Sequence, residues 1–209
     1  MNATMTFGYT KLDKYVPNWS KARVVIVAGR PALGKTAFAV SLASNIAIDQ
    51  KMQSAFFSME ESERELKSRF MSNICELDNR KINDNTLNEE EKAKYKKGLK
   101  KFNDSPILIK ASSGLSVSDF SSKVNTYLPH RKRYSRNVPC MADIERVGNI
   151  GRESDVILLL HRPEFYGFAG DMPKNKGIAE IIVIKNIYGK KGSFLLGFIP
   201  EFSRFYNLV

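Results

Sequence analysis

One segment of eight residues, 29–36 with the sequence GRPALGKT, limits what this chain can fold into more than any other segment. It matches in full the pattern of a phosphate-binding loop, in which two glycines frame four variable residues ahead of a lysine and a serine or threonine. An apolar run, 24–28, precedes it, and the segment 37–47 behind it is dense enough in apolar residues for a buried helix. A chance glycine turn needs neither neighbour, whereas a phosphate-binding loop needs both. The sequence therefore predicts an α/β fold with a site for a nucleoside triphosphate.

Each part of this loop has a physical role. Gly29 and Gly34 lack a β-carbon, so the backbone can approach the phosphates closely. The loop's N–H groups and the N-terminus of the next helix then face the anion. Lys35 brings a positive charge to the β- and γ-phosphates, and the hydroxyl of Thr36 is a ligand for Mg²⁺. The residues predicted to bind the nucleoside triphosphate here are consecutive in the chain: Gly29, Arg30, Pro31, Ala32, Leu33, Gly34, Lys35, Thr36 and Ala37.

Short apolar runs alternate with segments of helical period along the rest of the chain. A capping box at 62–65 precedes an apolar stripe of Leu66, Phe70 and Ile74, which predicts a helix. Two late runs, 178–184 and 194–199, predict a hairpin at the edge of the sheet. The alternation predicts one domain over residues 1–209, a mostly parallel sheet flanked by helices. The other predicted strands are 54–59, 106–109 and 156–160, and the other predicted helices are 88–103 and 116–127.

The net charge of +11 indicates a polyanionic partner, nucleic acid first and an anionic membrane surface second. A basic surface that serves solubility is the alternative. The lysines of 88–103 fit a solvated helix face better than a specific DNA site. The basic stretch 130–136 is the better nucleic-acid candidate, because Arg131 and Arg133 neutralise phosphates and Tyr134 can stack on a base. That stretch is equally consistent with a junction that joins two parts of the chain and binds nothing.

The sequence gives little support for a metal site of histidines and cysteines or for a membrane-spanning segment. Its two cysteines, Cys75 and Cys140, and its two histidines, His130 and His161, show no metal-ligand spacing and no disulfide framework. No apolar run reaches the ~20 residues that span a bilayer. The first residues lack the pattern of a signal peptide. We therefore expect a cytoplasmic protein without a membrane partner.

Five segments of the chain, taken in order, follow a pattern shared with a known family. They are FGYTKLD, AGRPALGKTAFA, FFSMEES, PCMADIERVGNIGRESDVILLLHRPEFYG and GIAEIIVIKNIYGKKGSFLLGFIPEFSRFYNL. These segments resemble the ATPase domain of the bacterial replicative DNA helicases of the DnaB type, and the resemblance covers nearly the whole chain apart from residues 128–137. It implies a RecA-like core, a hexameric ring, ATP-driven movement along single-stranded DNA and contact with other replication proteins.

The resemblance also assigns roles to single residues. It implies that Glu60 is the catalytic carboxylate beside Lys35, although its position at a strand end alone fits a solvated acid equally well. It implies that Lys185 reaches the nucleotide of a neighbouring subunit. The loop with Arg146 and Gly148 matches a family loop that contacts the DNA backbone, but the order of arginine and glutamate is reversed here, so a solvated surface charge is the equal alternative for Arg146.

Three departures separate this chain from the family pattern. The apolar strand that ends in a Mg²⁺-binding aspartate has no counterpart, and neither does the next strand with its polar sensor residue. The arginine of the family's hairpin is replaced by Ile187. Either the sequence lacks residues near 128–138 that the molecule contains, or the chain is a relative that is naturally shortened there. We favour the second explanation, because the substitution at Ile187 is independent of the missing strands.

Three functions remain open from the sequence. The first is an ATP-driven helicase motor domain, with Lys35 and Glu60 as catalytic residues and Thr36 as the metal ligand. The second is a non-hydrolysing nucleotide-binding relative that joins or regulates a helicase ring. The third is a basic DNA-binding module with a vestigial loop.

Overall fold

The computed structural model of this chain describes residues 5–17, 22, 24–58, 60–111, 154–166 and 176–208. The chain divides into two compact units. The first unit comprises Met1–Lys35, Val117–Phe198 and Tyr206–Val209, and the second comprises Thr36–Ser116 and Ile199–Phe205.

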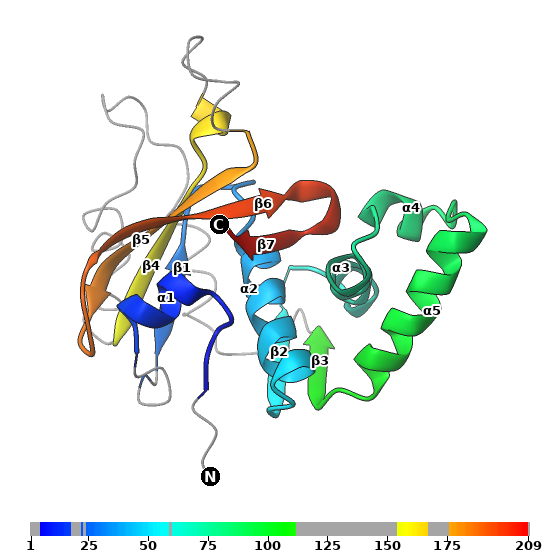
Figure 1. Ribbon diagram of the computed structural model, residues 1–209, viewed down its shortest axis with the longest axis horizontal. Helices are drawn as coiled ribbons and strands as arrows, with labels where there is room; N and C mark the ends of the chain where they lie inside the picture. The colour runs from blue at the N-terminus through cyan, green and yellow to red at the C-terminus, as the bar shows by residue number, and fades with distance from the viewer. Residues whose placement is uncertain are drawn as a thin grey trace. The chain divides into compact units, whose positions relative to one another are not determined.

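A five-stranded sheet with the order β1-β4-β5-β6-β7 organises the first unit (Figure 1). β1 and β4 are parallel, with Val25 opposite Val156, whereas β4 and β5, and β5 and β6, are antiparallel. Among the described residues of this unit, one α-helix is present, α1 (Thr10–Tyr15), and a 3-10 helix follows β4 at Pro163–Tyr166. The strands are β1 (Val25–Ala28), β4 (Val156–His161), β5 (Ile178–Asn186), β6 (Gly192–Ile199) and β7 (Arg204–Asn207), the last with its two final residues in this unit.

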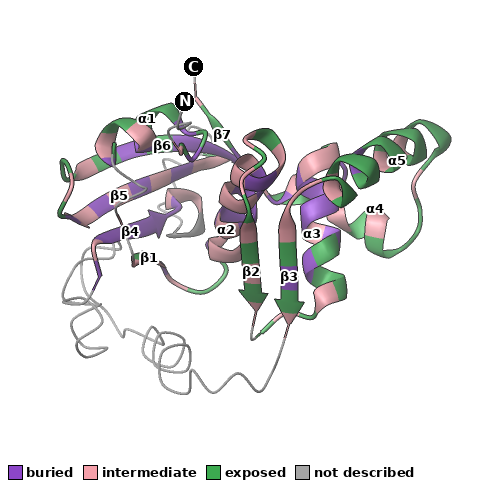
Figure 2. Ribbon diagram, turned by 90° about the horizontal axis from the view of Figure 1, so that it is seen from below, coloured by how far each residue is buried: buried purple, intermediate pink, exposed green. Residues whose placement is uncertain are grey.

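The core of the first unit forms on β4. All six residues of β4 are buried, as expected of an apolar strand with neighbours on both sides (Figure 2). Ile26 and Ala28 of β1 pack with Ile157 and Leu159 of β4 in one apolar cluster. This cluster fixes the register of β1, and the phosphate-binding loop begins where β1 ends.

The second unit contains a parallel pair of strands and most of the helices in the described part of the chain. Phe56 lies opposite Ile109 in the pair, and the ring of Phe70 packs 5.5 Å from that of Phe56 and 5.8 Å from that of Phe102. These contacts belong to the apolar core between the strand pair and its helices. The elements are α2 (Lys35–Ser44), a π-helix (Asn45–Asp49), β2 (Ser54–Ser58), α3 (Glu63–Cys75), α4 (Asn79–Asn83), α5 (Glu89–Asn103) and β3 (Ile107–Ala111).

Buried polar contacts tie the segment 199–205 into the second unit. The side-chain amide of Asn73 donates to the hydroxyl of Ser41 at 2.9 Å and to the carbonyl of Ser203 at 3.0 Å. The N–H of Phe205 donates to the same Ser41 hydroxyl at 3.2 Å. Because buried polar groups are costly without partners, these bonds explain why serine and asparagine are accepted between apolar helices.

The structure confirms the α/β fold and the predicted strands at β1 to β6. The capping box is present, since the Ser62 hydroxyl accepts from the N–H of Glu65 and the Glu65 carboxylate accepts from the N–H of Ser62 at 2.8 Å. Two details are corrected. The described sheet of the first unit is mixed, and the β5–β6 hairpin lies inside it because β7 adds a further strand beside β6. The helix predicted at 116–127 falls outside the described residues.

Candidate nucleotide-binding site

Both glycines of the loop are required by the backbone around them. A β-carbon on Gly29 would lie 2.8 Å from the carbonyl oxygen of Leu160 in β4, which is closer than β-carbons approach other atoms. Gly34 has φ +95°, a conformation that side chains disfavour, and a β-carbon there would lie 3.2 Å from Cζ of Phe198. The two motif glycines therefore hold the loop against β4 at one end and against β6 at the other.

The residues between the glycines keep the loop compact. Leu33 is fully buried and anchors its middle. Ala32 has φ 63°, so it lies in the left-handed region two residues before Gly34. Left-handed residues of this kind occur in the backbone nests that bind anions through their N–H groups. The conformation of the loop therefore suits a phosphate ligand.

The charge of Lys35 lies over this loop. Its ammonium group donates to the carbonyl oxygen of Arg30 at 3.2 Å, so the side chain folds back from the first turn of α2. The first turn of α2 contains no acidic residue. Helix N-termini favour negative charge, and a lysine in that position is compensated best by an external anion. Thr36 follows Lys35 in the helix, and the boundary between the two units falls between these residues.

His161 lies at the end of β4, one strand away from the loop. It is buried and opposite Glu180 of β5. Burial lowers the pKa of His161, the nearby charge of Arg30 lowers it further, and Glu180 acts in the opposite direction. The imidazole is therefore neutral at neutral pH and adds no positive charge beside the loop. This geometry fits a strand-end histidine that packs in the core.

Glu60 and Glu61 follow β2 in the second unit and differ in their contacts. Glu61 is fixed, because Nε of Arg69 donates to its carboxylate at 2.6 Å. Glu60 is exposed and makes no hydrogen bond or ion pair within the part of the chain that the structure describes. Of the two acids, Glu60 is therefore the one that is available to a ligand, and its catalytic role stays a prediction.

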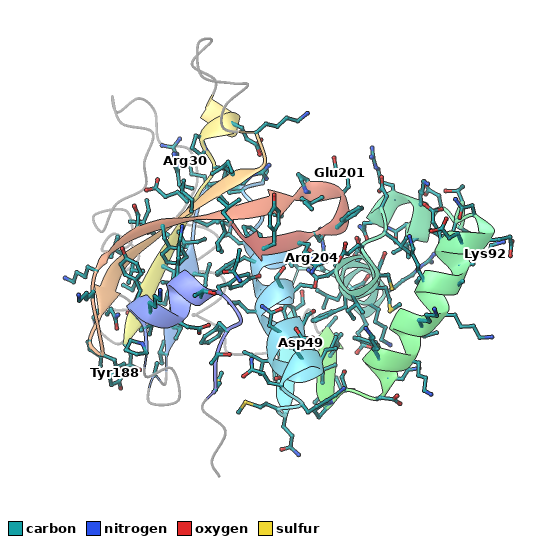
Figure 3. The ribbon with its side chains drawn as sticks, viewed as in Figure 1. Arg30, Asp49, Lys92, Tyr188, Glu201 and Arg204 are labelled. Carbon is teal, nitrogen blue, oxygen red and sulfur yellow. The ribbon has the colours of Figure 1, made fainter. Side chains whose placement is uncertain are left out.

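Lys185 and Ile187 belong to the opposite end of the sheet from the loop. Lys185 lies opposite Ile157, which in turn lies opposite Ile26 near the start of β1. Figure 3 shows the same separation, with Arg30 at one end of this sheet and Tyr188 at the other. Ile187 is 57% exposed. Lys185 is thus not brought together with the loop of its own chain.

The remaining predicted site residues belong to segments outside the described part of the chain. Arg131, Arg133, Arg146 and Gly148, which the sequence suggested for DNA binding, lie outside the described residues. The described residues contain no group of three histidine, cysteine, aspartate or glutamate side chains that could hold a metal ion. They also contain no helix with the length and apolar character needed to cross a membrane.

Comparison with known proteins decides the family. The model of the DnaB-like helicase C terminal domain matches residues 4–134 and 128–207. The chain belongs to this family. The confirmed resemblance rests on residues throughout the chain, the phosphate-binding loop among them.

Curated relatives of this DnaB-like domain are replicative helicases. The chain is 23% identical to a probable replicative DNA helicase of Trieres chinensis, which aligns with 99% of this chain and 58% of the relative. It is 26% identical to the replicative DNA helicase DnaB of Geobacillus stearothermophilus, over 96% of this chain and 56% of the relative. The chain therefore spans little more than half the length of these relatives.

Solved structures agree on the fold. A DnaB-like replicative helicase, solved in a study of its interactions with primase, superposes with a TM-score of 0.80 at 22% identity over 98% of this chain and 62% of that chain. A solved ATPase domain gives a TM-score of 0.77 at 21% identity, covering 98% of this chain and 91% of the other. The RecA-like fold expected from the resemblance is thereby confirmed.

Proposed function

We propose that residues 1–209 form the ATP-binding motor domain of a replicative DNA helicase, which couples ATP hydrolysis to movement on single-stranded DNA. One observation carries this proposal. The loop 29–36 has the two glycines that its backbone requires, and the Lys35 ammonium lies over the loop at 3.2 Å from the carbonyl oxygen of Arg30. A lysine held over a loop of backbone N–H groups fits the β- and γ-phosphates of ATP.

The chemistry divides among few residues. The N–H groups of the loop bind the phosphate oxygens, and Lys35 neutralises the charge that moves onto the leaving phosphate during transfer. The hydroxyl of Thr36 would hold Mg²⁺ bound with the nucleotide, and the metal would supply further neutralisation of charge. Glu60, exposed and without a partner among the described residues, orients the attacking water. The catalytic residues of the proposal are thus Lys35 and Glu60.

A neighbouring copy of the chain completes the site. Lys185 lies at the end of the sheet away from the loop of its own chain, which supports a role at the nucleotide of the next subunit. We therefore propose a ring, with six subunits expected from the family. Single-stranded DNA binds through Arg146 and Gly148 and through the basic residues Arg131 and Arg133. Other replication proteins are further partners, as the primase interactions studied for one structural relative suggest.

We further propose that the domain is shortened internally near residues 128–138. The alignment with the Trieres relative spans 263 positions, at least 54 more than the 209 residues of this chain can fill. The family model matches in two segments that meet at 128–134. β2 and β3 pair only with each other among the described strands. An intact mass well above 23.7 kDa would contradict this proposal.

A second function is favoured by Ile187. It occupies the place of the family's arginine, and it is 57% exposed on the hairpin, where a long cation would have room. An arginine at this place contributes orders of magnitude to the rate of phosphate transfer. Its loss supports a relative that binds nucleotide, hydrolyses it weakly or not at all, and regulates a helicase ring.

One experiment separates these functions: ATP hydrolysis with and without single-stranded DNA, for the wild type and for Lys35→Ala. Turnover that DNA stimulates and Lys35→Ala abolishes supports the motor domain. ATP binding without turnover supports the regulatory relative. Binding of DNA without any nucleotide binding leaves only the basic DNA-binding module.

A further inference from the structure

The ring of Phe198, near the end of β6, contacts two parts of the first unit that are far apart in the sequence. Its Cζ lies 3.2 Å from the position of a β-carbon on Gly34, the last glycine of the phosphate-binding loop. The guanidinium carbon of Arg162 lies over the same ring, 4.4 Å from its centroid. Both residues are 5% exposed. A buried cation therefore lies on an aromatic ring that also limits the space beside Gly34.

Arg162 is fixed in this position by Glu164. Nε of Arg162 donates to Oε1 of Glu164 at 2.9 Å, and Nη2 donates to the same oxygen. The other carboxylate oxygen accepts from the N–H of Gly177 at 3.0 Å. The carbonyl of Gly177 in turn accepts from the N–H of Phe198 at 2.7 Å. These four residues, which we call the Phe198 cluster, form a closed chain of contacts.

The energetics of the cluster favour a rigid arrangement. A buried guanidinium is tolerated only when a carboxylate and hydrogen bonds compensate it, and breaking such a pair leaves an uncompensated charge. The attraction between a desolvated cation and an aromatic face adds to the orientation of the ring. The position of the Phe198 ring is thus determined by Arg162 and Glu164 as well as by the packing of β6.

The backbone of Gly34 is the part of the loop that a fixed Phe198 ring would restrict. Its φ of +95° is one of many conformations open to glycine, and it directly precedes Lys35. A loop that moves among several conformations loses affinity, because ordering it costs free energy on binding. A ring packed beside Gly34 restricts those alternatives before the ligand arrives.

We propose that the Phe198 cluster positions the phosphate-binding loop, and that it raises the affinity for a nucleoside triphosphate by fixing Gly34 and Lys35 in advance. Phe198, Arg162 and Glu164 act through the loop and touch no phosphate themselves. The inference rests on the proposed nucleotide binding and adds three positioning residues to it. Sequence patterns did not indicate them, because Gly34, Arg162 and Phe198 come together only in the folded sheet.

The test compares two substitutions on one strand. Phe198→Leu removes the ring beside Gly34. Phe194→Leu is the matched control, because Phe194 is 6% exposed on the same face of β6 and packs 5.4 Å from the ring of Tyr15 instead. A fluorescent ATP analogue is titrated with Mg²⁺ into the full chain, and the melting temperature of each variant is recorded beside the dissociation constant.

We expect Phe198→Leu to weaken binding of the analogue about tenfold, and Phe194→Leu to leave it within about twofold, at a similar fall in melting temperature. Equal affinities of the two variants would overturn the inference and leave the proposed function standing. A wild type that binds no analogue would overturn both.

A second variant, Glu164→Gln, tests the proposal even if Phe198→Leu does not fold. Glu164→Gln keeps an acceptor for the N–H of Gly177 but removes the charge that pairs with Arg162. We expect about threefold weaker binding of the analogue, in line with a partial loss of orientation. Wild-type affinity in a folded Glu164→Gln variant would contradict the role of the ion pair.

Discussion

Gly29 and Leu160 approach so closely that a β-carbon on Gly29 would lie 2.8 Å from the carbonyl oxygen of Leu160. The approach follows from the parallel register of β1 and β4, in which Ala28 lies opposite Leu159. The first glycine of the phosphate motif is therefore also required for the pairing of β1 with β4, because this pairing leaves no room for a side chain at position 29.

Gly29→Ala is expected to destabilise the fold. The added methyl group forces β1 away from β4, and overpacking of this kind costs ~1–3 kcal/mol. Urea unfolding followed by circular dichroism measures the change. Ala32→Gly is the matched control in the same loop, because it removes a β-carbon from a residue with φ 63° and should be neutral or slightly stabilising. An unchanged unfolding midpoint for Gly29→Ala would show that the two strands are not this close.

The stability of the fold should depend on pH through His161. Burial keeps its pKa below the ordinary value of ~6.5, so the unfolded chain binds a proton at a higher pH than the folded chain does. The stability is therefore fully present above pH ~6.5 and falls as the pH decreases from there towards the lower pKa of the folded state. Melting temperatures between pH 7 and pH 5 measure this fall.

His161→Gln should reduce the fall in melting temperature over that range. His130→Gln, at the other histidine of the chain, separates the contribution of His130 to the pH dependence of stability from that of His161. The carboxylates with lowered pKa, Glu65, Asp78 and Glu91, change protonation below this range and do not interfere. An identical pH dependence in the wild type and in His161→Gln would contradict a neutral, buried imidazole.

Ser62→Ala should destabilise the second unit by ~1 kcal/mol, the usual effect of losing an N-cap. The Ser62 hydroxyl accepts from the N–H of Glu65, and no methyl group can replace it. Urea unfolding of the variant gives the change in free energy. Ser62→Asp retains an acceptor at the cap and should recover most of the loss. If alanine and aspartate behave alike, the cap does not stabilise α3.

Ile187→Arg should raise the rate of ATP hydrolysis in the presence of single-stranded DNA. If the chain assembles as proposed, the new guanidinium reaches the neighbour's nucleotide, where such a group increases the rate at least about tenfold. The control is Ile187→Gln, which is polar and exposed but carries no charge. Phosphate release assays measure the rates of both variants. Equal rates for arginine and glutamine would argue against a site shared between copies.

Local sequence patterns predicted much of this structure. The parts that depend on contacts between distant segments were not predicted. The strand before Gly29, the capping box at Ser62 and the buried stripe with Phe70 depend on neighbours within a few residues, so the sequence revealed them. β7 was missed because its four residues form a strand only beside β6. The packing of Phe198 between Gly34 and Arg162 could likewise not be predicted from the sequence, since it depends on how three distant segments meet.

Binding of a nucleoside triphosphate by the loop at 29–36 underlies every role proposed for this chain, and equilibrium titration with ATP and Mg²⁺ measures it. Isothermal titration of the full chain should show saturable binding to the wild type. Lys35→Ala should bind about 10- to 100-fold more weakly, because it loses a charged hydrogen bond, while its circular dichroism spectrum stays unchanged. Equal binding by the two proteins, or no binding by a folded wild type, would show that the loop is not a triphosphate site.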